Sequence, residues 1–122
     1  PVVEDPETFP RSYVEELRKE NANWRERAHN AETYDATFEG LTFRVLNTPQ
    51  KGSLQFDASI KDHHDGCLRY YWNGAEWGCS LYGVAHKKDI DLSAIAKRYG
   101  GGGHKQACGC TFKTLPKELG GA

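Results

Sequence analysis

Four consecutive glycines, followed by a histidine and a lysine, form the stretch of the sequence best suited to chemistry. A single glycine is enough to end the helix-forming segment before them, so Gly100–Gly103 exceed what a helix cap needs. Successive glycines let bare backbone amides converge on an anion, because no Cβ blocks the approach. We expect His104 and Lys105 to open a short helix whose N-terminal amides also favour negative charge. The block therefore predicts phosphate binding, and a flexible turn with a chance histidine is the alternative.

Positive charge surrounds this block, although the whole chain is nearly neutral. The 122 residues carry 16 basic and 17 acidic side chains, so overall charge points to no class of partner. Residues 1–35 hold nine acidic and five basic residues, whereas residues 36–122 hold eight acidic and eleven basic ones. No acid occurs between Asp91 and Glu118, a span that contains Lys97, Arg98, Lys105, Lys113 and Lys117. This uneven distribution predicts two functional segments.

The cysteines give a weaker signal. The four cysteines are Cys67, Cys79, Cys108 and Cys110. Their spacing lacks the paired C-x-x-C motif of a structural zinc site. Three Trp, five Phe and six Tyr can build a core without disulfides, so we expect reduced thiols. Cys108 and His104 could form a nucleophile–base pair, but a small packed residue is the simpler interpretation of Cys108.

Asp62-His63-His64-Asp65 is the one tetrapeptide rich in possible metal ligands. A two-metal phosphoesterase centre needs several carboxylates that converge on ions about 3.5–4 Å apart. One polar tetrapeptide cannot supply them. We therefore predict a solvated turn at residues 62–65, with a metal site as the alternative, and we expect no cofactor for this chain.

Aromatic residues flank Asn73-Gly74, a pair that is the strongest short-range signal for a β-hairpin. Such rings stack nucleobases in single-strand binders. Aromatic side chains at alternating strand positions more often belong to a core. We therefore expect a core role for Tyr70, Tyr71, Trp72 and Trp77, with base stacking as the alternative.

Strand-like and helix-like segments alternate after Phe38. We expect a helix over Asp91–Tyr99 that ends at Gly100, and strands at Leu41–Leu46, Cys67–Trp72, Glu76–Tyr82 and Cys110–Leu115. Residues 50–66 are ambiguous between a short helix and a loop. This order predicts an α/β (α+β) fold over residues 36–122, a small mixed sheet with flanking helices.

Residues 1–35 are typical of an extended, Pro-rich lead-in followed by a long amphipathic helix. Ser12 and Glu15 form a capping box, and the next stretch lacks Gly and Pro to about Ala31. Heptad a and d positions would be Val14, Leu17, Asn21, Trp24, Ala28 and Ala31. The seam predicts a homo-oligomer through residues 12–32, and packing of the helix on its own domain is the alternative.

The segment from Asp89 to Gly109, DIDLSAIAKRYGGGGHKQACG, resembles a known family signature. It is similar to the GGGGH-x-x-A-A-G block and preceding helix of the DHH-associated domain, the C-terminal substrate-binding domain of DHH phosphoesterases. That family includes oligoribonucleases, cyclic-dinucleotide phosphodiesterases and single-strand exonucleases. Ser80-Leu81-Tyr82 resembles the short strand motif that faces the glycine loop there, and Phe43–Asn47 resembles the opening strand. The resemblance covers roughly residues 38–116.

The resemblance implies a phosphate site. A phosphate of a nucleotide or short oligonucleotide would be held by His104 and the amides of Gly100, Gly101, Gly102 and Gly103. Ser80 and Tyr82 would line the same pocket, with Lys105 and Arg98 as nearby cations. Cys108 replaces the second Ala of the signature, and Cys110 stands where an apolar residue is usual, so we expect the packing to persist.

One large part of the family pattern is missing from this sequence. In the family the metal-binding aspartates lie in a separate N-terminal domain of well over a hundred residues. Here only about 37 residues precede the match. Manganese would therefore be implied only where a catalytic partner domain is supplied.

Together these features favour a non-catalytic module, on a helical arm, that binds a nucleotide, a cyclic nucleotide or a short RNA or DNA oligonucleotide. The N-terminal helix resembles helical segments of bacteriophage scaffold-type proteins. One form of such a module is therefore a phage-encoded sponge, a protein that sequesters a nucleotide signal. Alternatives are a substrate-binding fragment or subunit of a Mn-dependent DHH phosphodiesterase or oligoribonuclease, and an assembly protein acting through its helix.

The sequence also carries expectations about location. No apolar run approaches the roughly 18 residues that a membrane span needs. The acidic, Pro-rich beginning lacks the basic start and apolar stretch of a secretory signal. We therefore expect no membrane partner and a cytoplasmic location, in a bacterial or phage-infected cell.

Overall fold

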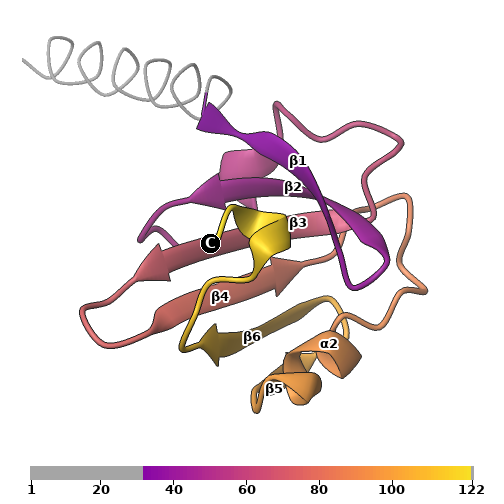
Figure 1. Cartoon of the computed structure of the whole chain (residues 1–122). Helices are drawn as coiled ribbons and strands as arrows, with labels where there is room; N and C mark the ends of the chain where they lie inside the picture. Colours follow the sequence, from indigo (N-terminus) through magenta and orange to yellow (C-terminus); the bar gives the residue numbers. More distant parts are fainter. Residues whose placement is uncertain (1–31, 122) are drawn as a thin grey trace, which may run out of the picture.

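The computed structural model describes residues 32–121, which form one six-stranded mixed sheet in the order β1-β2-β3-β4-β6-β5 (Figure 1). The strands are β1 Tyr34–Phe38, β2 Leu41–Asn47, β3 Gly66–Trp72, β4 Trp77–Tyr82, β5 Gly102–His104 and β6 Ala107–Phe112. The helices are α2 Ser93–Arg98 and the short 3-10 turns η2 Leu54–Phe56 and η3 Lys117–Leu119. The α+β fold class is confirmed. The predicted N-terminal helix, to about Ala31, and its proposed heptad seam lie outside the described residues.

The first hairpin, β1–β2, adds a strand that the sequence did not indicate. Phe38 pairs with Leu41, so only Glu39 and Gly40 make the turn. Both have positive φ, 52° and 77°, as the tight hairpin turn with the matching twist requires. Because Glu39 is an unusual residue at a turn position with positive φ, the sequence did not predict this turn.

Residues 48–65, within which the ambiguous segment lies, are the crossover between β2 and β3. Strands β2 and β3 are parallel. After β2 the chain must therefore cross back to the end of the sheet where β2 began before β3 can start. The crossover contains η2, whose Phe56 is fully buried. This segment therefore covers one face of the sheet.

The predicted hairpin around Asn73-Gly74 is confirmed as β3–β4, with a turn longer than two residues. Trp72 pairs with Trp77, so four residues lie between them. The Asn73 side-chain oxygen accepts hydrogen bonds from the amides of Ala75 and Glu76, both at 2.9 Å. This local bonding sets the register, and with it which residues of the two strands lie side by side.

Helix α2 ends at Gly100, as expected. The amide of Gly100 donates to the Lys97 carbonyl at 3.1 Å, and that of Gly101 donates to the Ala96 carbonyl at 2.9 Å. These two bonds and the left-handed Gly100, with φ 80°, make a Schellman motif. The motif turns the chain back toward β6.

The expectation that His104 and Lys105 open a short helix is wrong. Instead β5 and β6 form an antiparallel hairpin in which His104 pairs with Ala107. The Lys105 carbonyl accepts from the Leu92 amide at 2.9 Å. The Gln106 side chain donates to the Ile90 carbonyl at 2.8 Å. These bonds fasten the turn to the start of α2, so the chain runs extended. The last strand, β6, accordingly begins and ends three residues earlier than predicted.

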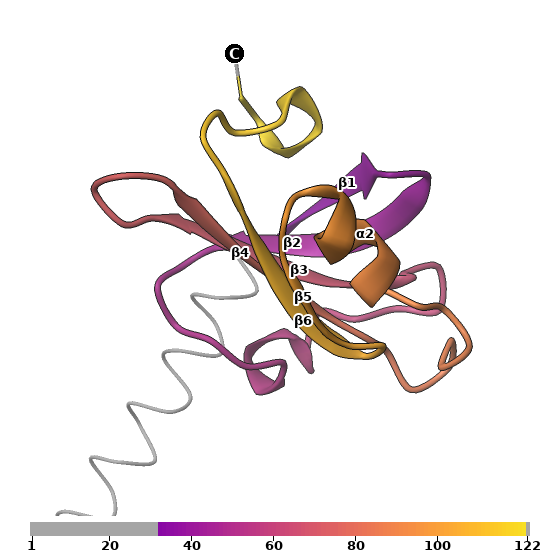
Figure 2. The same cartoon turned by 90° about the horizontal axis from the view of Figure 1, so that it is seen from below.

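The two faces of the sheet carry different cores. Figure 2 shows α2 and the C-terminal segment on one side of the sheet and the crossover on the other. The first face holds the larger core, which includes Phe43, Leu68, Leu81, Leu92 and Phe112. The second face holds a small core of Leu46, Phe56, Cys67 and Val84. Among residues 32–121, no further hydrophobic cluster covers the remainder of the second face.

All four cysteines are free and buried. Burial raises the pKa of the Cys67 thiol to about 12 and that of Cys108 to about 11. Cys79 and Cys110 face each other across β4 and β6 in the larger core. Because the thiolate is the reactive form, the raised pKa values of Cys67 and Cys108 indicate that these two are packing residues. Within residues 32–121, no helix is long and apolar enough to cross a membrane.

Candidate phosphate-binding site

A pocket of about 610 Å³ opens on the uncovered part of the second face, a size typical of small-molecule sites. Directly paired residues of neighbouring strands point to the same face. One such row runs Gly102–Gly109–Ser80–Arg69 across β5, β6, β4 and β3. The next row holds Thr111, Gly78 and Tyr71. Of these residues, Gly78 and Gly109 have no side chain to fill the floor of the pocket, while Arg69, Ser80 and Tyr71 form its side.

Arg69 is the charged centre of the pocket. It is only 5% exposed, and its Nε donates to Ser80 Oγ at 3.0 Å. Its Nη1 donates to the Thr48 carbonyl at 3.2 Å. Gly78 leaves space beside Nη2, since a Cβ there would lie 3.9 Å from that atom.

No carboxylate among residues 32–121 is paired with this cation, Arg69. In this part of the chain no acid lines the pocket, where Lys51 supplies a second positive charge. A buried charge is costly unless it is paired. The pocket is therefore suited to an anion that arrives from outside.

The four glycines of the Gly100–Gly103 block differ in whether the fold requires a glycine at that position. Gly100 has the left-handed conformation of the helix cap. A Cβ on Gly101 would lie 2.0 Å from the Gly109 carbonyl. Gly103, with φ 135°, would press a Cβ to 2.8 Å from the Ala107 carbonyl. Gly102 has ordinary φ and open space where a Cβ would lie, so the packing of the fold does not require a glycine there.

The structure brings three of the predicted site residues together at the pocket. Ser80, Gly100 and Gly101 line it. Gly102 and His104 share its face of the sheet by register, His104 being exposed and one row further along. Successive rows on one face are about 7 Å apart. His104 is thus placed to meet a ligand that extends beyond the pocket.

The remaining four predicted residues lie outside the pocket walls. Tyr82 contributes to the small core, and its hydroxyl accepts from the Gly52 amide at 2.8 Å, which anchors the crossover. Arg98 is on α2 and pairs with Glu39 of the β1–β2 turn. Lys105 lies in the β5–β6 turn, and Gly103 packs on β6. Cys108 faces the larger core, away from His104, so the structure does not form a nucleophile–base pair.

Arg69 is the functional candidate that sequence reasoning missed. An arginine inside the apolar strand Gly66–Trp72 is itself a signal, because charged residues are rarely buried without a partner. Its pairing with Ser80 depended on the length of the turn, since a two-residue turn at Asn73-Gly74 would have shifted the register. Lys51, Gly78, Gly109 and Thr111 also line the pocket and were not singled out.

One group within residues 32–121 has the composition of a metal site: Asp35, His63 and His64. His64 is fully buried, so the prediction of a solvated turn is wrong for it. Its Nδ1 accepts the Lys61 amide at 2.8 Å, and its Nε2 lies 2.7 Å from Asp35 Oδ1. With Nδ1 occupied as an acceptor, the ring proton sits on Nε2 and donates to the carboxylate. That nitrogen has no lone pair for a metal, so the group is a hydrogen-bonded clamp.

Asp35 is the centre of this clamp. Arg44 donates to its Oδ1 at 2.8 Å, and His63 Nε2 lies 3.0 Å from Oδ2. Burial alone would raise the pKa of Asp35, but the hydrogen bonds from Arg44, His63 and His64 hold it well below its usual range. The clamp joins β1, β2 and the crossover.

No family model and no curated protein matches the sequence. Solved structures do match the fold. A pGpG-specific phosphodiesterase, PggH from Vibrio cholerae, aligns with a TM-score of 0.60 at 13% identity, over 87% of this chain and 38% of that one. A DHH domain of a member of the S1P family of ribosomal proteins aligns with a TM-score of 0.54 at 18% identity, over 88% of this chain and 30% of that one.

The expected resemblance to a DHH-associated domain is therefore confirmed at the level of fold. The chain spans about a third of the length of the solved structures it matches. It has the fold of one part of those DHH-family proteins.

Proposed function

We propose that this chain is a binding module for nucleotides or short oligonucleotides that holds a phosphate group in the Arg69 pocket. The single observation that carries this proposal is the buried Arg69 guanidinium, which has no carboxylate partner among the described residues and lines a pocket with an exposed second cation, Lys51. Arginine presents several donors in a rigid fork, which suits the oxygens of a phosphate.

The surrounding residues supply the rest of the proposed site. Gly78, Gly102 and Gly109 let the phosphate approach the backbone closely. Ser80 fixes the Arg69 fork by accepting from Nε. His104, on the same face, contacts a neighbouring group of the ligand. The likeness in fold to a phosphodiesterase described as pGpG-specific supports a phosphorylated dinucleotide as the first ligand to test.

The test compares two arginines in the full chain. Arg69→Gln should weaken binding of the dinucleotides pGpG and pApA about tenfold or more, because a hydrogen bond to a charged group is lost. Arg98→Gln is the matched control, since Arg98 is exposed and already paired with Glu39. Isothermal titration measures the affinities, and thermal unfolding checks that both variants fold.

Two further variants keep the test decisive if Arg69→Gln fails to fold. Lys51→Ala removes the exposed cation at the rim, and His104→Ala removes the exposed imidazole. Both should weaken dinucleotide binding with little change in melting temperature. Unchanged affinity in both, or equal losses for Arg69→Gln and Arg98→Gln, would contradict the pocket assignment.

A second candidate function is the substrate-binding piece or subunit of a DHH phosphodiesterase. It is favoured by the observation that the chain covers 38% of the phosphodiesterase that it matches. On that alternative, manganese and the cleaving residues belong to a catalytic partner domain. The proposal has two further parts. The first is that the protein acts as a phage-encoded nucleotide sponge in the cytoplasm. The second is that the chain self-associates through residues 12–32.

A further inference from the structure

The four aromatic residues around the β3–β4 turn divide into two pairs. Tyr70 is 7% exposed and Trp77 packs on the larger core. Tyr71 and Trp72 are 42% and 43% exposed. The expected core role is therefore correct for the first pair and wrong for the second. Tyr and Trp are enriched at contact surfaces because they combine a large apolar ring with a polar group, so the two exposed rings are candidate contact residues.

Tyr71 and Trp72 are consecutive in a strand, so their side chains project to opposite faces of the sheet. Tyr71 lines the Arg69 pocket on the second face. Trp72 lines a separate cleft of about 680 Å³ on the first face, together with Trp77, Lys113, Leu115 and the chain at Gly120 and Gly121. The tip of the hairpin thus lies between two cavities, each with one exposed ring.

Trp72, the exposed ring in the cleft on the first face, packs on further aromatic residues. The centroids of Trp72 and Trp77 are 5.4 Å apart, and those of Trp77 and Tyr70 are 5.8 Å apart. The Tyr70 hydroxyl lies 2.8 Å from that of Tyr34, which donates to the Leu119 carbonyl at 2.9 Å. This chain of contacts holds Trp77 against the core. A planar ligand that enters the cleft would meet an organised pair of indoles, which lowers the entropic cost of binding.

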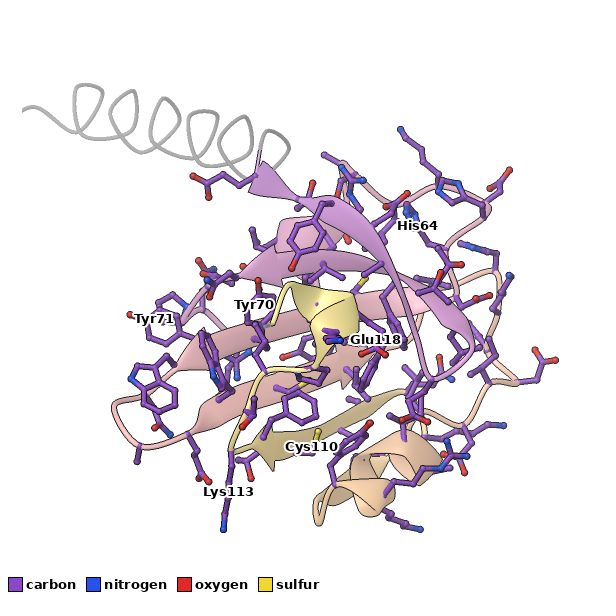
Figure 3. The ribbon with its side chains drawn as sticks, in the orientation of Figure 1. His64, Tyr70, Tyr71, Cys110, Lys113 and Glu118 are labelled. Atoms are coloured by element: carbon purple, nitrogen blue, oxygen red, sulfur yellow. The ribbon has the colours of Figure 1, made fainter. Side chains whose placement is uncertain are left out.

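A cation accompanies each ring. Lys51 lines the pocket beside Tyr71, and Lys113 lines the cleft beside Trp72. Figure 3 shows Tyr71 at the hairpin end of β3 and Lys113 beyond the end of β6, at the same side of the molecule. Glu76 is an acid within the turn, but it lines neither cavity. Proteins that bind single-stranded nucleic acid combine aromatic rings, on which bases stack, with cations that contact the phosphates.

We propose that the hairpin tip carries a second, base-stacking subsite and that the ligand is a single-stranded oligonucleotide long enough to pass around it. One base stacks on Tyr71 beside the Arg69 pocket. A base further along the strand enters the Trp72–Trp77 cleft, where Lys113 meets a phosphate. A mononucleotide or dinucleotide is too short to engage both rings, because the sheet lies between them. This inference rests on the proposed function of the pocket.

The test measures affinity against oligonucleotide length. Fluorescence anisotropy compares a phosphorylated thymidine dinucleotide with the corresponding hexanucleotide, for the wild-type chain and Trp72→Ala. Removal of a stacked ring costs roughly fivefold or more in affinity. We expect the wild type to bind the hexanucleotide more tightly than the dinucleotide. Trp72→Ala should lose that gain and keep the dinucleotide affinity, which also shows that the variant folds.

Two variants separate stacking from a general effect of surface change. Trp72→Phe keeps a ring and should retain most of the gain. Leu54→Ala removes another large hydrophobic side chain, 82% exposed and outside both cavities, and should change nothing.

A hexanucleotide with no gain over the dinucleotide, or an equal gain in Trp72→Ala, would overturn the inference and leave the cleft to a protein contact. A gain that depends on Trp72 but not on Arg69 would uphold the stacking subsite and overturn the phosphate pocket. Binding of neither ligand by the wild type would overturn the proposed function, and this inference with it.

Discussion

Gly102 differs from the glycines on either side of it. Gly101 and Gly103 are required because a Cβ would press into β6. Gly102 has neither positive φ nor a close neighbour, and its register partner Gly109 lies on the pocket floor. On the proposed function, close approach of a ligand beside the pocket explains a glycine at this position.

Gly102→Ala should therefore separate binding from stability. We expect no loss of melting temperature, because the added methyl has space, and about a tenfold loss of dinucleotide affinity, because it narrows the approach to the backbone. Gly103→Ala is the matched control: its φ of 135° and its contact with the Ala107 carbonyl should lower stability by about 1–3 kcal/mol. Thermal unfolding and isothermal titration measure the two effects. Loss of stability in Gly102→Ala, or full binding by it, would show that the ligand does not approach there.

At the scale of elements, β1 depends on side-chain contacts because it is an edge strand. Among the strands of residues 32–121, it pairs only with β2. Asp35 ties it to Arg44 of β2 and to His63 and His64 of the crossover. At the opposite end of β1, Glu39 accepts from Tyr99 and Arg98 of the α2 segment. These polar contacts hold the first hairpin to the elements that carry the pocket.

The Asp35 clamp should make stability depend on pH in the acid range. A carboxyl whose folded pKa is lowered contributes its stability above its unfolded pKa, about 4, and loses it as pH falls through the folded value. Asp35→Asn should lower the melting temperature by a few degrees at pH 7. The difference from wild type should shrink below about pH 4.

The control for this prediction is Asp62→Asn, which changes an exposed carboxyl of the same tetrapeptide as the two clamp histidines. Calorimetry at several pH values measures the melting temperatures. An Asp35→Asn difference that persists at low pH, or an equal effect from Asp62→Asn, would mean that the charge of Asp35 contributes nothing.

At the scale of the whole molecule, one sheet supports two differently covered faces. The first face buries the larger core under α2 and the C-terminal segment. The second face is only partly covered by the crossover and leaves the Arg69 pocket open. The described residues offer no cluster of carboxylates that could hold two metal ions. On the proposed function, this open pocket receives the ligand.

The full chain should accordingly show a thermal shift with pGpG that needs no manganese. A ligand at a hundred times its Kd stabilises the folded state by about 2.7 kcal/mol, which raises the melting temperature by several degrees. The shift should decrease as salt rises, because the main contact is to phosphate. Chromatography afterwards should recover intact dinucleotide. Manganese-dependent cleavage by the chain alone would instead favour the enzymatic alternative.

The sequence by itself determined the local features of this protein. Asn73-Gly74 predicted the β3–β4 hairpin, Gly100 the end of α2, and the apolar pattern most strands, because short-range bonding and side-chain periodicity set these elements. The resemblance of the Gly100–His104 block and the residues around it also indicated the fold. The sequence could not reveal β1, since its turn uses Glu39 in an uncommon conformation.

Only the tertiary structure decided which residues meet at the site. Pairing of four strands places Arg69, Ser80, Gly109 and Gly102 in one row, although they are separated by up to 40 positions along the chain. The same pairing directs Tyr82 into the small core, and the packing of α2 places Arg98 on Glu39. A strand's register and the face to which each side chain points depend on its partners, and a single residue type does not encode them.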